Sequence, residues 1–219
     1  MKKVIDYIHS LRLKLEEYGD WLERYNRNLP NAFNMIFNDL TLTLELLDYY
    51  YRLWSSLDVS AFSAKDVERM RKENWKRVMQ ITKWAFIDTL SSLEFSLKKI
   101  LETINPKVLS VIRERRRNKP IYFRSIIKEL HREGYVNDEA YNGWITLIEI
   151  RNCVIHNNAI PEFNRILYLN DLKIVFTRGQ MLTAKLDFFV KLIDYAIKNY
   201  KRLVEALIED RSSIRRQQA

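Results

Sequence analysis

Apolar side chains recur at helical spacing along most of this 219-residue chain. Over residues 86–104 an apolar residue returns every three or four positions, which places a hydrophobic stripe along one face of a helix. Clusters that contain Asn, Pro, Gly or Ser interrupt the pattern at a few points. The pattern therefore predicts helices over residues 2–27, 32–57, 64–104, 120–131, 138–156 and 184–209, the fifth of them capped by Asn137 or Asp138.

One region has the composition of β-strands instead. The segments ILYL and LKIVF predict two strands, which Asn170-Asp171 would join as a hairpin. A hairpin that ends at Arg178-Gly179 is an alternative register. The expected fold class is therefore all-α, with a small β-hairpin near 165–178. We expect an N-terminal helical extension over 1–63, a helical bundle over 64–210 and a frayed basic tail over 211–219.

Composition narrows the range of functions. With 47% apolar and 30% charged residues, the chain is expected to fold as a soluble protein. Its four glycines cannot form a Gly-rich phosphate loop or a dinucleotide fingerprint. The single cysteine, Cys153, rules out an internal disulfide and fits a reducing compartment. Because no signal peptide and no uncharged run near the length of a membrane span is found, we expect a cytoplasmic protein without membrane contact.

The net charge of +9 suggests a polyanionic partner. A basic run between two predicted helices supplies candidate RNA-binding residues, which could follow a phosphate backbone: Arg113, Arg115, Arg116, Arg117 and Lys119. The aromatic residues Tyr122, Phe123 and Tyr135 could stack on unpaired bases nearby. The alternative interpretation is a solvated linker followed by core aromatics.

The segment Arg151–His156 combines a phosphate-binding cation, a polar residue and a side chain that titrates near neutrality. Spacing alone is weak support, because on the order of one Arg-to-His match is expected by chance, and Arg124 with His131 provides another. The asparagine directly after the arginine is more selective. On a helix, Asn152 and His156 share a face, one turn beyond Glu149.

These residues resemble the HEPN superfamily (higher eukaryotes and prokaryotes nucleotide-binding). The segment EIRNCVIHNN looks like the ribonuclease motif of the family, and FIDTLSSLEFSLKKIL is similar to an early family helix. The resemblance covers about residues 80–209. Two departures limit it: Asn158 stands where members paired with a nucleotidyltransferase antitoxin often carry tyrosine, and residues 1–63 have no counterpart in a minimal HEPN unit.

The resemblance implies a metal-independent endoribonuclease that cleaves single-stranded or looped RNA and needs no cofactor. His156 would act as general acid or base, Arg151 would hold the scissile phosphate, and Asn152 would orient the substrate or the histidine. Glu149 and Glu94 are supporting candidates, the second as a carboxylate that pairs with Arg151. Because the site is usually shared between two units, the resemblance implies a homodimer. It also implies a toxin or antiphage defence role, with an antitoxin or regulatory protein as a further partner.

Other interpretations remain open from the sequence. Arg151 and His156 could simply stabilise a helix C-terminus. The chain could also be a non-catalytic helical module that binds nucleic acid, nucleotide or a protein. Cys153 and His156 form a lone C-x-x-H pair, which is too few ligands for tetrahedral zinc, so no metal site is expected.

Overall fold

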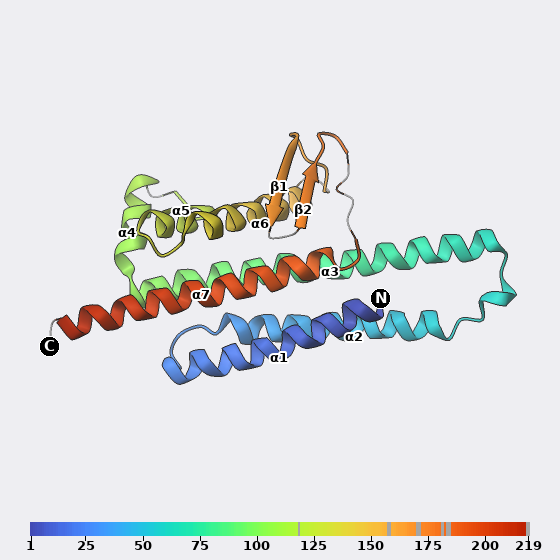
Figure 1. Cartoon of the computed structure of the whole chain (residues 1–219), viewed down its shortest axis with the longest axis horizontal. Helices are drawn as coiled ribbons and strands as arrows, with labels where there is room; N and C mark the ends of the chain where they lie inside the picture. The colour runs from blue at the N-terminus through green and yellow to red at the C-terminus, as the bar shows by residue number, and fades with distance from the viewer. Residues whose placement is uncertain (118, 157–158, 170–171, 181, 183–184, 218–219) are drawn as a thin grey trace.

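The computed structural model describes residues 1–117, 119–156, 159–169, 172–180, 182 and 185–217, with side chains as far as residue 210. Among these residues there are seven α-helices and one two-stranded antiparallel sheet, so the predicted all-α fold with a small hairpin is confirmed (Figure 1). The helices are α1 (Lys2–Tyr25), α2 (Ala32–Ser55), α3 (Ala64–Ile104), α4 (Pro106–Arg115), α5 (Phe123–Arg132), α6 (Asp138–His156) and α7 (Phe188–Gln217). A 3-10 turn, η1 (Val59–Ala61), links α2 to α3, and the strands are β1 (Arg165–Leu169) and β2 (Leu172–Phe176).

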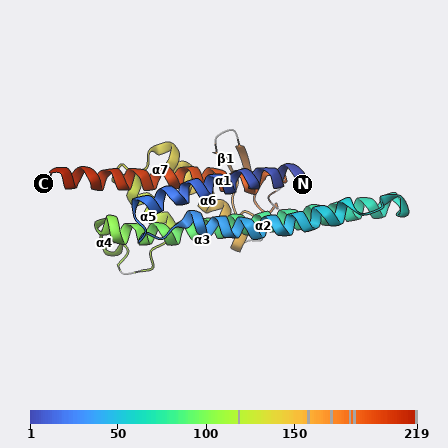
Figure 2. The same ribbon diagram turned by 90° about the horizontal axis from the view of Figure 1, so that it is seen from below.

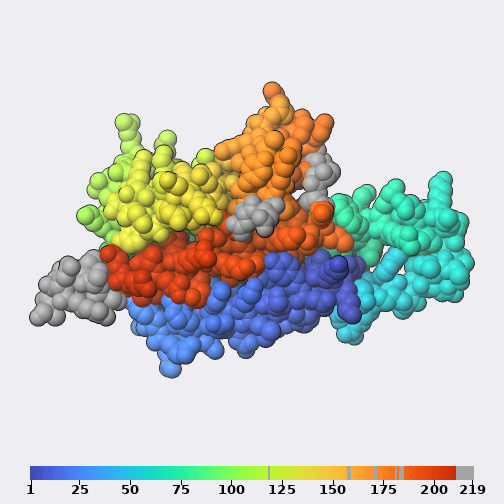
Figure 3. All heavy atoms as spheres, in the orientation of Figure 1, coloured from blue at the N-terminus to red at the C-terminus, as the bar shows by residue number. Residues whose placement is uncertain are grey.

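The long helices form a bundle in which α1, α2, α3 and α7 each pack on two neighbours. Helices α4, α5 and α6 and the hairpin lie on the opposite side of α3 and α7 from α1 and α2 (Figure 1). The end of α2 and the first part of α3 extend beyond the other helices as an arm with η1 at its tip (Figures 1 and 3). The charged first half of α3 therefore projects from the main body of the bundle.

Residues 1–63 share the hydrophobic core of the rest of the chain. One cluster of buried side chains runs from Val4 on α1 to Ile208 on α7. At its centre the Tyr200 hydroxyl donates to Ser96 Oγ over 2.8 Å, and Ser96 Oγ donates to the Pro30 carbonyl over 2.7 Å. This relay joins α7, α3 and the loop before α2, so α1 and α2 are layers of the same bundle.

Local signals in the sequence explain where several helices begin. The Asn31 side chain accepts from the N–H groups of Phe33 and Asn34 at the start of α2. Ser63 Oγ accepts from Asp66 N at the start of α3, as the spacing of the two residues predicts. Asn137 Oδ1 accepts from Ala140 N at the start of α6, which selects Asn137 over Asp138 as the cap.

The structure corrects three details. The helix predicted to begin at Pro120 begins at Phe123. The last helix begins at Phe188, while residue 184, its predicted start, lies outside the described residues. The backbone of the tail is helical as far as Gln217, where fraying was expected.

The hairpin has the first of the two registers considered. Leu169 pairs with Leu172 and Arg165 pairs with Phe176, although the connecting residues 170–171 lie outside the described part of the chain. Leu167, Leu169, Ile174 and Phe176 are buried beneath the hairpin, and the alternate residues face outward. Within the described residues, no helix has the length and apolar character needed to cross a membrane.

Candidate functional site

The Arg-Asn-x3-His segment forms the last turns of α6, beside the hairpin (Figure 1). Ala159 N donates to the Cys153 carbonyl over 3.0 Å and so satisfies one of the last carbonyls of the helix. Asn152 and His156 are exposed, whereas Cys153 and Val154 face the core. The helix therefore presents the amide and the imidazole to solvent at its end. Asn158, which was contrasted with the tyrosine of the family, lies outside the described residues.

Arg151 points toward α3 and is fixed there. Its Nη2 donates to Ser91 Oγ over 3.0 Å, and its Nη1 lies 3.4 Å from Glu94 Oε2. The arginine and glutamate side chains are 21% and 16% exposed. The predicted pairing of Glu94 with Arg151 is present, and the resulting contact sets the rotamer of the guanidinium.

Glu94 connects three helices. Its Oε1 accepts from Lys98 Nζ over 2.7 Å and from Phe123 N, the first residue of α5, over 3.1 Å. Its Oε2 faces Arg151. A single carboxylate thus holds the start of α5 and the arginine of α6 on α3, and Lys98 supplies a second positive charge beside it.

Glu149 ties the motif helix to the hairpin and to α5. Both of its oxygens accept from Arg165 Nη1, at 3.0 and 2.9 Å, and Arg124 Nη2 lies 3.7 Å from Oε1. The Glu149 side chain is 12% exposed. Arg124, Arg165, Ser91 and Lys98 were not singled out from the sequence as site residues. The partners of Arg124, Arg165 and Ser91 are distant in the chain, so no local pattern marks these three residues. Lys98 stands four residues after its partner Glu94 on the same helix.

The basic run divides into structural and exposed residues. Arg115 Nη1 bonds to the buried Glu129 at 2.6 Å, so its charge is neutralised within the fold. Arg116 donates to Ser125 Oγ and lies over the Tyr122 ring, 4.9 Å from its centroid. Arg113, Arg117 and Lys119 are exposed, with no side-chain partner among the described residues.

Contacts along the chain bring this turn to the motif. Arg116 lies on Tyr122, the next residue Phe123 bonds to Glu94, and Glu94 faces Arg151. Tyr122 is 57% exposed and can stack on a base, whereas Phe123 is buried and Tyr135 is half-buried with its hydroxyl bonded to Asp210. Of the three aromatic residues considered for stacking, only Tyr122 is exposed, with the Arg116 guanidinium over one face of its ring.

The arrangement provides a fixed cation and an open imidazole on one helix end. The side-chain hydrogen bonds of Arg151 among the described residues go to Ser91 and Glu94, and none goes to His156. Burial raises the pKa of the Cys153 thiol, which disfavours the thiolate that a nucleophile would need. Among the described residues, no group of three or more His, Cys, Asp or Glu side chains could hold a metal ion.

Glu94→Gln tests how firmly Arg151 is held. The substitution removes the charge that faces Arg151 and Lys98, so we expect the free energy of unfolding to fall by about 1–3 kcal/mol. Chemical denaturation followed by circular dichroism measures the change. The matched control is Glu102→Gln on the same helix, whose pair with Lys99 is largely exposed and should matter by less than ~0.5 kcal/mol. Equal losses for the two variants would contradict the proposed anchoring.

Comparison with known proteins does not identify relatives of the chain. A scan against models of protein families finds no match, and searches of curated proteins and of solved structures find no similar protein or fold.

Proposed function

We propose that the protein is a metal-independent endoribonuclease that acts in the cytoplasm on single-stranded or looped RNA. The observation that carries the proposal is the end of α6. An arginine held by Ser91 and Glu94 is followed directly by an exposed asparagine, and an exposed histidine stands one turn after that asparagine. Unpaired RNA is the expected substrate because the major groove of an RNA duplex is too narrow for side chains. The resemblance to HEPN ribonucleases adds a toxin or antiphage defence role.

The proposed reaction uses the ribose as the nucleophile. The 2′-hydroxyl loses its proton to a base and attacks the adjacent phosphorus, while the bond to the 5′-oxygen breaks and that oxygen takes a proton from an acid. The products are a 2′,3′-cyclic phosphate and a 5′-hydroxyl. Imidazole suits both proton transfers near neutral pH. The guanidinium of Arg151 offsets the negative charge that grows on the phosphate.

One histidine cannot be base and acid on both sides of the phosphate in the same step, so the proposal includes a homodimer. The surface beside the motif supports it. Ile166 and Val175, a cross-strand pair, are 52% and 48% exposed on the outer face of the hairpin, and Tyr168 is 65% exposed. Ile155, next to His156, is exposed as well. These apolar side chains give a second copy a surface to cover close to the histidine.

Cleavage in the presence of EDTA tests the reaction class. Purified protein incubated with a single-stranded RNA and excess EDTA is expected to yield fragments that end in cyclic phosphate, identified by mass spectrometry. The same sequence as a perfect duplex should be cut far more slowly. Intact RNA after long incubation at neutral pH, or cleavage that stops with EDTA, would refute the proposed chemistry.

The alternative is a non-catalytic helical module that binds nucleic acid, a nucleotide or a protein. The contacts of Arg151 favour it in one respect. Both terminal nitrogens are engaged by α3, and Nε is buried without a partner, so the side chain also serves as a clamp between α6 and α3. RNA binding that survives in the absence of any cleavage would select this alternative.

A further inference from the structure

Helix α2 carries an exposed apolar stripe that its own bundle does not use. Its inner face, which includes Ile36, Leu40 and Leu47, is buried in the core. Outside that face, five large apolar side chains are 38–62% exposed: Met35, Leu42, Leu46, Tyr49 and Leu53. Together with Asp39, these residues are spaced alternately four and three positions apart. This is the heptad spacing of residues that pack against another helix.

Helix α3 carries a second stripe with the same repeat. Trp84 is 52% exposed and Phe95 is 50% exposed, with Asp88 between them and Ile81 and Arg77 continuing the series toward the arm. Successive positions in this series are again three or four residues apart, with Ser91 filling the position between Asp88 and Phe95. The outward side of α3 therefore also exposes large apolar side chains, fewer than that of α2.

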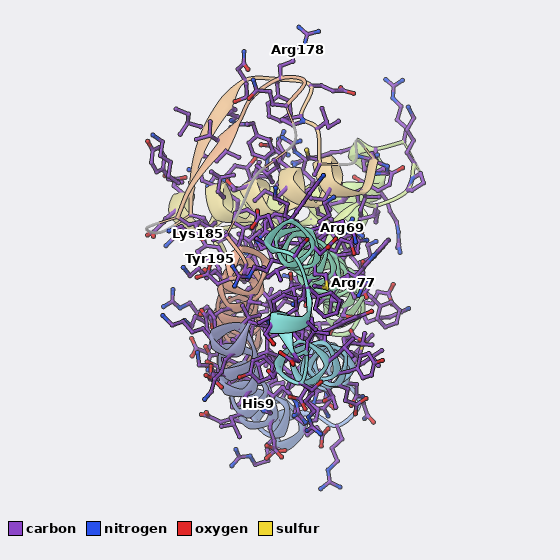
Figure 4. All side chains as sticks on the ribbon, turned by 90° about the vertical axis from the view of Figure 1, so that its right-hand side faces the viewer. His9, Arg69, Arg77, Arg178, Lys185 and Tyr195 are labelled. Atoms are coloured by element: carbon purple, nitrogen blue, oxygen red, sulfur yellow. The ribbon has the colours of Figure 1, made fainter. Side chains whose placement is uncertain are left out.

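One electrostatic interaction and one ring contact show that α2 and α3 lie side by side. Asp39 on α2 and Asp88 on α3 are close enough to interact electrostatically, and the Arg77 guanidinium lies 5.4 Å from the centroid of the Tyr50 ring. Figures 2 and 4, each turned by 90° from Figure 1, show α2 and α3 together on the side away from α1 and α7. Arg77 lies on that side (Figure 4). We call this surface the α2–α3 face, defined by the two stripes.

The centre of the α2–α3 face is acidic. Burial raises the pKa of Asp39, the charge of Asp88 raises it further, and burial also raises the pKa of Asp88. No cation bonds to either carboxylate among the described residues. Apolar side chains thus surround two carboxylates whose charged forms the fold itself does not compensate.

We propose that the α2–α3 face is the docking surface for a protein partner that lays an amphipathic helix on it, with a lysine or arginine between its apolar residues. The heptad spacing of both stripes fits the side chains of a third helix. A basic residue at the centre would compensate Asp39 and Asp88. An RNA phosphate would be repelled there, and a second copy packed symmetrically about the centre would bring four carboxylates together.

The face adjoins the candidate catalytic arginine. Ser91, the hydrogen-bond partner of Arg151 Nη2, lies on α3 between Asp88 and Phe95. A helix seated on the α2–α3 face would cover this position and hold Ser91 against Arg151. Docking itself does not depend on ribonuclease activity, so it can be tested by binding alone.

A pair of synthetic peptides tests the proposal. Each is a three-heptad amphipathic helix with leucine at its a and d positions, one with lysine and the other with glutamate at the central a position. Fluorescence anisotropy of labelled peptide with the full-length protein measures binding. We expect the lysine peptide to bind with a Kd at least about tenfold lower than that of the glutamate peptide. Asp39→Asn combined with Asp88→Asn should bring the ratio close to one.

Surface variants locate the binding. Leu42→Ser combined with Trp84→Ser should raise the Kd of the lysine peptide at least about tenfold. Both side chains are exposed, so their loss leaves the core intact. The matched control, Leu13→Ser on α1, removes a side chain that is 69% exposed outside the α2–α3 face and should bind like the wild type. Circular dichroism checks that each variant is folded. Equal binding of the two peptides, or binding unaffected by Leu42→Ser with Trp84→Ser, overturns the proposal. Sedimentation provides a further test. If the wild type is a dimer and only Leu42→Ser with Trp84→Ser abolishes that dimer, a second copy occupies the face and the proposal is overturned.

Discussion

His156→Ala is expected to reduce RNA cleavage by about 10²–10⁴-fold, the contribution that a positioned acid or base makes. The side chain is exposed at the end of α6, so its removal should leave the thermal unfolding midpoint unchanged. Cleavage of a fluorescent RNA under single-turnover conditions measures the effect. The result separates loss of a chemical group from loss of the fold.

His9→Ala is the matched control for this experiment. His9 is also an exposed histidine on a helix, but it lies on α1, on the opposite side of the molecule from Arg178, which follows β2 (Figure 4). This variant should cleave at the wild-type rate. Cleavage by His156→Ala at that same rate would remove His156 from the reaction and leave the binding module as the better description.

Tyr200→Ala is expected to lower the free energy of unfolding by about 3–5 kcal/mol. The ring is fully buried, packs edge-on against Phe33 at 5.6 Å between centroids, and carries the hydroxyl that bonds to Ser96. Its removal leaves a cavity where α7, α3 and the start of α2 meet. Urea unfolding, followed by both tryptophan fluorescence and circular dichroism, measures the loss.

The same measurement tests whether residues 1–63 unfold with the rest. The control is Tyr25→Ala at the end of α1, where the side chain is 40% exposed and a change below ~1 kcal/mol is expected. For the wild type, fluorescence and circular dichroism should report one transition, because the core is shared between the N-terminal helices and α3 and α7. Two separate transitions would show that the first 63 residues fold as an independent unit.

Helix boundaries could be predicted from the sequence where the signals are local. The bounds of α3 agree with the prediction because Ser63 and Asp66 form a cap at its start and Asn105-Pro106 ends it. The predicted start of α5 was wrong for a physical reason. Pro120 favours a helix start, but the N–H of Phe123 is bonded instead by Glu94, which is 29 residues earlier in the chain. A cap supplied by another helix leaves no local trace in the sequence.

The candidate site could be predicted in the same partial way. Asn152 and His156 share an exposed face because both belong to one helix, and that follows from spacing alone. Glu94 could be proposed as the partner of Arg151 because its helix was expected to pack near the motif. Ser91 and Arg165 were missed, since their contacts depend on how α3 and the hairpin pack on α6. The direction of the Arg151 side chain, toward α3, likewise required the tertiary structure.

The two oxygens of Glu94 are committed to different neighbours, one to the start of α5 and the other to Arg151. The basic turn that precedes α5 and the guanidinium on α6 are therefore thermodynamically linked through one carboxylate. A ligand that draws the turn outward weakens the hold on Arg151, and a ligand that draws Arg151 away loosens the turn by the same free energy. On this view an RNA strand that binds Arg113, Arg117 or Lys119 does more than anchor itself, because its binding also changes how readily the arginine can reach a phosphate.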